Sequence, residues 1–120
     1  MIKIDLYTKY YLGELETTLI EKNSSNQILF EVILYDYHFN KILSLIPLGQ
    51  YDSDSVMYNY FNKSGWYDKN WECERVQEFL DQLNTISNLV SNDFLESFNA
   101  VKKICESVIS HNNRLYIELL

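Results

Sequence analysis

The stretch "QILFEVILYDYHF", residues 27–39, decides the class of fold. β-Branched and aromatic side chains dominate it, and such side chains pack well on the pleated surface of a sheet. The run "NSSN" at residues 23–26 comes directly before it and is rich in turn-forming residues. We therefore predict a central β-strand over residues 27–39, with the other elements arranged around a sheet.

Further strands are expected along the chain on both sides of this one. Residues 1–7, "MIKIDLY", and residues 114–120, "RLYIELL", alternate apolar and polar side chains, the period of a half-buried strand. Residues 41–49, "KILSLIPLG", predict a short strand that Pro47 either ends or confines to a sheet edge, because proline has no ladder donor. Residues 10–22 could form a helix or a strand. Their leucines have helical spacing, but Gly13 and the pair Thr17 and Thr18 weaken a helix, so we predict a strand.

Two amphipathic helices are predicted in the C-terminal half. The first runs from Asp68 or Lys69 to Leu89, and its apolar stripe has helical spacing. This stripe consists of Val76, Phe79, Leu80, Leu83 and Ile86. The second helix begins after Ser91 or Asn92, ends near residues 111–113, and has its own apolar face. That face consists of Phe94, Phe98, Val101, Cys105 and Val108.

These elements predict one α+β domain over residues 1–120. Its antiparallel sheet has about four or five strands, both chain termini contribute strands, and the two C-terminal amphipathic helices pack on one face. Between the sheet segments and the helices, residues 50–70 are polar and aromatic with little regular period, and one helical turn is expected over residues 56–61.

The net charge of the chain restricts the kinds of molecule that it is expected to bind. The 120 residues carry 17 acids and 10 bases, a formal net charge of −7. Such a chain repels phosphate backbones, so nucleic acid is not expected as a direct ligand, and it favours basic partners. The N-terminal segment has no continuous apolar run of the signal-peptide kind, and no apolar stretch is long enough to span a membrane. We expect a soluble, cytoplasmic protein.

Residues that suggest catalysis or metal binding are few. Asp36 and His38 lie two positions apart, so on a strand they would share a face, where a carboxylate could orient a general base. A small enzyme or ligand-binding protein built on this pair is one alternative function, although no nucleophile motif accompanies it. The cysteines and histidines are too scattered for a ligand motif, so no metal and no cofactor is expected. Cys73 and Cys105, both at predicted helical positions, allow one disulfide but are expected to be reduced.

Acidic and aromatic residues concentrate in residues 51–80. This segment has six acids against three bases, and it holds 8 of the 18 aromatic residues. Some of these rings must belong to the core, but rings interleaved with carboxylates are also typical of a surface that binds a basic protein. The predicted partner-binding residues are Asp52, Asp54, Tyr58, Tyr67, Asp68, Trp71, Glu72 and Glu74.

The protein resembles the immunity proteins that neutralise bacterial toxins. The resemblance lies in its small size, its acidity, the aromatic and acidic loop that leads into a helix, and the lack of a catalytic set of residues. The immunity proteins of contact-dependent growth inhibition systems are the nearest comparison. The resemblance covers the character of the whole chain and transfers no individual residue. It implies a cytoplasmic, non-enzymatic inhibitor of one cognate toxin, such as a nuclease with a basic cleft. A structural subunit of an oligomer is the remaining alternative.

Overall fold

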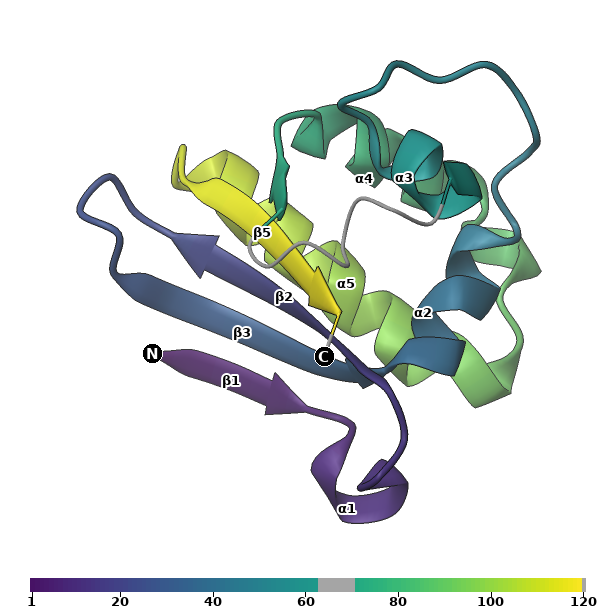
Figure 1. Ribbon diagram of the computed structural model, residues 1–120, viewed down its shortest axis with the longest axis horizontal. Helices are drawn as coiled ribbons and strands as arrows, with labels where there is room; N and C mark the ends of the chain where they lie inside the picture. The colour runs from purple at the N-terminus through teal and green to yellow at the C-terminus, as the bar shows by residue number, and fades with distance from the viewer. Residues whose placement is uncertain (63–70, 120) are drawn as a thin grey trace.

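Five strands form one sheet in the computed structural model, which describes residues 1–62 and 71–119 (Figure 1). The strands are β1 (Ile2–Asp5), β2 (Glu16–Lys22), β3 (Ile28–Tyr35), β4 (Trp71–Cys73) and β5 (Arg114–Leu119). The helices are α1 (Thr8–Tyr11), α2 (Asp36–Leu43), α3 (Val56–Asn62), α4 (Val76–Thr85), the 3-10 turn η1 (Ser87–Leu89) and α5 (Asn92–Ser110). The chain therefore has the α+β fold that the sequence predicts.

The order of the strands in the sheet is β1-β3-β2-β5-β4, so β2 lies at the centre. The pairs β2–β3, β2–β5 and β4–β5 are antiparallel, as predicted, and the strands nearest the two termini both belong to the sheet. The pair β1–β3 is parallel, which makes the sheet mixed. This parallel pairing follows from the topology. Strand β2 is antiparallel to β1, and β3 reverses direction again and inserts between them.

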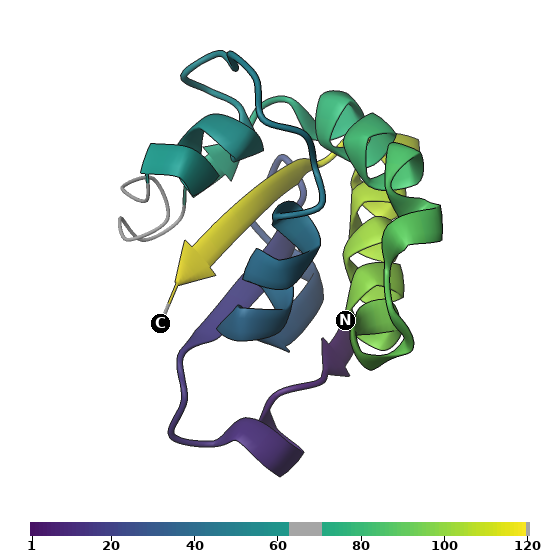
Figure 2. The ribbon, with the colours of Figure 1, turned by 90° about the vertical axis from the view of Figure 1, so that its right-hand side faces the viewer.

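Helix α5 supplies most of the core on one face of the sheet. It contacts β2, β3 and β5, while α4 packs against α5, and Figure 2 shows both helices on the same side of the strands. The predicted stripe of α5 is correct, since four of its residues are at most 2% exposed and Phe94 is half-buried. Those four are Phe98, Val101, Cys105 and Val108. The stripe of α4 is also confirmed at Phe79, Leu80, Leu83 and Ile86.

The predicted strands over residues 36–39 and 41–49 are wrong, because Asp36–Leu43 forms helix α2. Phe39, Ile42 and Leu43 are buried at helical spacing, so the same apolar residues that suggest a strand also satisfy a helix. Asp36 in the first turn suits the positive end of the helix dipole. For residues 10–22, the strand is confirmed over Glu16–Lys22, after the single helical turn of α1.

The first predicted helix starts later than expected. Trp71–Cys73 is the edge strand β4, and α4 begins at Val76. In β4, Trp71 and Cys73 point toward the core while Glu72 is exposed, and pairing with β5 outweighs the weak local helical preference. Cys73 is therefore a strand residue, not a helical one. Both thiols are free and buried, and burial raises the pKa of Cys73 to about 12.

Phe79→Ala is expected to reduce the free energy of unfolding by about 3–5 kcal/mol, because Phe79 is 1% exposed and its removal leaves a cavity. The Phe79 ring lies edge-on to Phe39, with 6.5 Å between their centroids, so the substitution also removes an aromatic contact between α4 and α2. Urea denaturation measures the loss. Leu89→Ala is the control: Leu89 is 62% exposed, so its truncation should change stability by less than about 0.5 kcal/mol. Equal effects of the two substitutions would contradict this description of the core.

Candidate functional site

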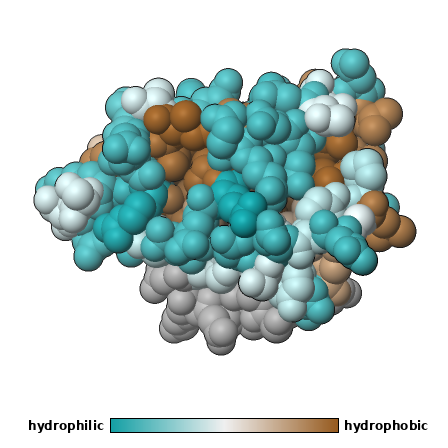
Figure 3. Space-filling model, turned by 90° about the horizontal axis from the view of Figure 1, so that it is seen from above, coloured by the Kyte–Doolittle hydropathy of each residue, from teal (hydrophilic) through white to brown (hydrophobic). Residues whose placement is uncertain are grey.

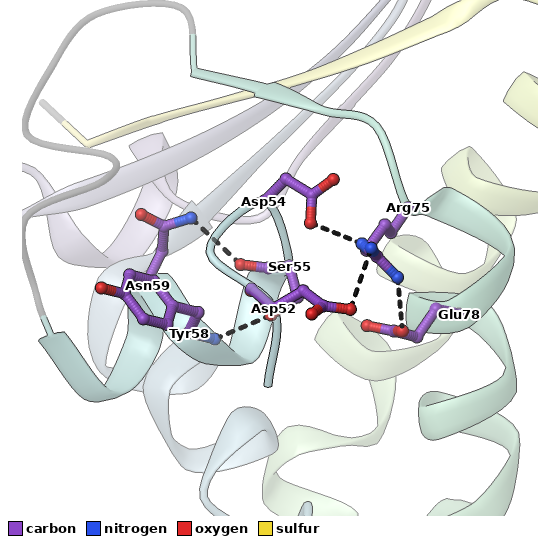
Figure 4. A network of polar contacts seen from close by, with 7 residues as sticks. All are labelled: Asp52, Asp54, Ser55, Tyr58, Asn59, Arg75 and Glu78. Atoms are coloured by element: carbon purple, nitrogen blue, oxygen red, sulfur yellow. Dashed lines mark hydrogen bonds and ion pairs between the residues drawn. The ribbon is translucent and has the colours of Figure 1, made fainter. Parts of the chain in front are cut away.

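Arg75 gathers three carboxylates at the start of α4 (Figure 4). Its Nε donates to Asp54 Oδ1 at 2.5 Å, and its Nη2 lies 2.9 Å from Asp52 Oδ2. Its Nη1 lies 3.4 Å from Glu78 Oε2 on the next turn of the helix. One guanidinium thus joins the loop before α3 to α4 and fixes the position of three acids.

The loop that carries Asp52 and Asp54 is held by hydrogen bonds of its own. The Ser55 hydroxyl donates to the Asp52 carbonyl at 2.7 Å and accepts the backbone N–H of Tyr58 at 3.1 Å. The Asn59 side-chain amide donates to the Ser55 carbonyl at 3.0 Å, and Ser55 and Asn59 are both buried. These hydrogen bonds fix the residue at which helix α3 begins, so the loop with the two aspartates is held in a defined position (Figure 4).

The carboxylates remain accessible although they are paired. The side chains of Asp52, Asp54 and Glu78 are 69%, 42% and 38% exposed. The hydrogen bond with Asp54 raises the pKa of Arg75, and three acids around one base leave the group negative. Burial raises the pKa of the Cys73 thiol, and Glu78, Asp54 and Glu72 add smaller contributions to this rise.

We call the acidic surface the set of Asp52, Asp54, Glu72, Glu74 and Glu78. Glu72 and Glu74 are exposed on either side of Cys73, and the Tyr116 hydroxyl lies 3.5 Å from Glu72 Oε1. Glu78 was not among the predicted binding residues, and only its contact with Arg75 identifies it. The predicted residues Tyr67 and Asp68 lie outside the residues that the structure describes.

The two predicted aromatic anchors have different environments. Trp71 is half-buried and packs against the core, so it belongs mainly to the interior. Tyr58 is 39% exposed and, with Tyr51 and Phe61, lines a shallow hollow of about 280 Å³ beside α3. The side of the molecule that carries α3 and α4 is largely hydrophilic, with apolar groups in separate patches (Figure 3).

Asp36 and His38 do not form the predicted pair. On helix α2, positions two apart point in different directions, so the shared face expected from a strand is lost. Asp36 accepts hydrogen bonds from Thr17 Oγ at 2.5 Å and from the Asn40 amide at 2.8 Å. His38 Nδ1 lies 3.3 Å from Ser97 Oγ on α5. Asp36 and His38 line separate pockets.

A third polar group, which the sequence does not reveal, surrounds Glu21 on β2. Glu21 is 1% exposed and accepts hydrogen bonds from Ser107 Oγ and Asn113 Nδ2, both at 2.6 Å. His111 Nδ1 lies 3.3 Å from Ser107 Oγ, which brings the residue types of a hydrolytic triad together. The same nitrogen lies 2.8 Å from the Ser107 carbonyl, an acceptor only, so it donates there and has no lone pair for the serine proton. This group holds α5 against the sheet and is not arranged for nucleophilic catalysis.

Over residues 1–62 and 71–119, no three His, Cys, Asp or Glu side chains are placed to hold a metal ion. In the same ranges, every helix is too short or too polar to cross a lipid bilayer. Comparison of the chain with protein-family models, curated proteins and solved structures found no match.

His38 is expected to make the folded state less stable as the pH falls. Burial lowers its pKa below the ordinary 6.5, with a smaller opposing effect of Asp93, so the unfolded chain binds the proton more tightly than the folded one. Well above pH 6.5, His38 is neutral in both states and its titration does not affect stability. As the pH falls through 6.5 toward the lower pKa of the folded state, protonation of His38 favours the unfolded chain. Urea denaturation of the wild type and of His38→Gln, between about pH 7.5 and about pH 5, should show a steeper loss for the wild type. Parallel curves, or an NMR titration of His38 with a pKa above 6.5, would contradict this.

Proposed function

We propose that the protein is a non-enzymatic binding protein that neutralises a basic protein partner, in the manner of a toxin-immunity protein. The observation that carries this proposal is the group of exposed carboxylates that Arg75 holds in fixed positions at the junction of α3 and α4. The described residues of this region, 51–62 and 71–80, contain five acids and one base. The proposed contact is therefore negative as a whole.

Preorganisation distinguishes these acids from an ordinary solvated surface. Free carboxylates lose rotamer freedom when a partner orders them, and this loss reduces affinity. Asp52 and Asp54 are already held by Arg75, so a partner's lysine or arginine meets acceptors in fixed positions. A partner guanidinium can bind the remaining lone pairs without first breaking the contacts with Arg75.

The hollow beside α3 supplies the apolar part of such a contact. Tyr58 and Phe61 are each 39% exposed and border it, and the Tyr51 hydroxyl donates to the Pro47 carbonyl at 2.6 Å, which fixes the third ring. Aromatic groups beside charged ones are enriched at the centres of protein interfaces. We propose that Tyr58 is the anchor and that the acidic surface directs the approach of the partner.

The proposed partner is a toxin with a basic active-site cleft, such as a nuclease, which an acidic inhibitor would block by occupying the place of its substrate. Small-enzyme chemistry at Asp36 and His38 has less support, because these residues line different pockets. A subunit of a larger assembly is supported by one observation, the 53% exposed Ile2 on the edge strand β1. Sedimentation analysis of the purified chain tests that alternative. A monomer would argue against the subunit of an oligomer and in favour of the proposed inhibitor.

The test uses the product of the neighbouring gene, since toxins and their immunity proteins are usually encoded side by side. Reversing Glu72 and Glu74 to Lys should slow association by about tenfold at low salt and change dissociation less, because exposed charges steer the encounter. Tyr58→Ala should instead speed dissociation, at a loss of about 2 kcal/mol of binding free energy. Stopped-flow or surface-plasmon kinetics separates the two effects.

Glu14→Lys is the control, because Glu14 comes three residues after α1. Helix α1 lies at the opposite end of the molecule from α3 and α4 (Figure 1). Its effect on association should be much smaller than that of the two reversals in the acidic surface. A partner that binds the Glu72 and Glu74 reversals as fast as the wild type would place the interface elsewhere.

A further inference from the structure

A pocket of about 420 Å³ opens where α1, α2 and the first turns of α5 meet. Asp5 and Tyr11 contribute to its wall from the N-terminal segment, His38 from α2, and Asp93 and Glu96 from α5. Its volume lies within the range of sites that bind small organic groups. None of these residues belongs to the acidic surface, which lies at α3 and α4.

Stacked rings form the rigid side of this pocket. The Tyr11 ring stacks on Tyr35, with centroids 4.4 Å apart and an angle of 19° between the planes. His38 is packed edge-on between Tyr11 and Phe94, at 5.2 Å from each centroid. These contacts hold the Tyr11 ring in place in the wall of the cavity.

Three carboxylates also line the pocket, those of Asp5, Asp93 and Glu96. Among the described residues, Asp93 and Glu96 have no hydrogen bond or ion pair through their side chains, whereas Asp5 already accepts from the Thr8 hydroxyl and from two backbone N–H groups. Lys9 is the one Lys or Arg among the described residues of the lining, and its ammonium lies 5.2 Å from the centroid of the exposed Tyr10 ring. Three acids and one base leave the pocket negative.

His38 adds a polar group without adding charge at neutral pH. Its Nδ1 lies within reach of the Ser97 hydroxyl, and its burial favours the neutral imidazole. A neutral ring in this position does not repel a positively charged ligand, as an imidazolium would.

We propose that this pocket binds an ammonium or guanidinium group carried on an aliphatic chain. Carboxylates give such a group charge-assisted hydrogen bonds, and an aromatic face attracts it as well. A bare metal ion fits less well, because no three carboxyl, imidazole or thiol groups of the described residues converge as its ligands. This inference does not rest on the proposed toxin partner. The cation can be a free polyamine or the side chain of a lysine or arginine in a protein.

The experiment is an NMR titration of the full chain with N-acetyl-arginine methylamide, with spermidine, and with N-acetyl-citrulline methylamide as the uncharged counterpart. Both cations should give saturable shifts of the His38 ring and of the Ser97 amide. The citrulline probe should bind at least about tenfold more weakly, since it lacks the charge. Tighter binding of the arginine probe would indicate a protein side chain as the natural occupant, and tighter binding of spermidine a free polyamine.

Variants locate the site. Asp93→Asn combined with Glu96→Gln should weaken binding of the arginine probe by about tenfold or more, and Glu96→Gln alone by less. Both side chains are exposed, so the fold should persist, and the melting temperature checks this. Glu106→Gln is the control, because Glu106 is an exposed acid ten residues further along α5, about 15 Å from Glu96.

The proposal fails if neither cation gives saturable shifts at His38 and Ser97. It also fails if Glu106→Gln weakens binding as much as the double variant, because general attraction to an acidic protein would then explain the result. The partner kinetics described above do not involve this pocket, so the two proposals can fail independently.

Discussion

The packing of α5 against the central strands is the constraint on which the rest of the structure depends. Phe98, Val101 and Ile104 are at most 2% exposed, and they cover Leu19 of β2 and Ile117 of β5, which are fully buried. Because β2 has a strand on each side and a helix above it, its polar residues must be satisfied internally, as Glu21 is by Ser107 and Asn113. Fixing α5 in this way also places its N-terminal turns, which carry Asp93 and Glu96, beside α1 and α2.

The position of the acidic surface depends on the same sheet, through the short pairing of β4 with β5 at its edge. Three residues of β4 pair with β5, and this places Arg75 directly after the sheet, within reach of the loop that contains Asp52 and Asp54. An exposed ion pair contributes little to stability, so the value of the Arg75 network lies in the positions it gives to the carboxylates. The geometry that folds the chain therefore also arranges the surface proposed for binding.

The sequence predicts those parts of the fold that one apolar period determines. The stripes of α4 and α5 and the C-terminal strand are of this kind, since Phe79, Phe98 and Ile117 are all buried as their spacing indicates. Helix α2 was not predicted, because residues 36–46 satisfy both periods and contact with Thr17 and α5 decides between them. β4 is too short for a periodic signal. The Arg75 network joins residues 21 positions apart, and no local pattern indicates such a contact.

Hydrogen exchange of the chain, alone and bound to the product of the neighbouring gene, tests most directly whether the acidic surface is the binding surface. Binding should slow exchange in peptides that cover residues 52–61 and 72–78, and it should leave the amides around α1 unchanged. Slower exchange confined to α1 and the start of α5 would contradict this account, because the partner would then occupy the opposite end of the molecule.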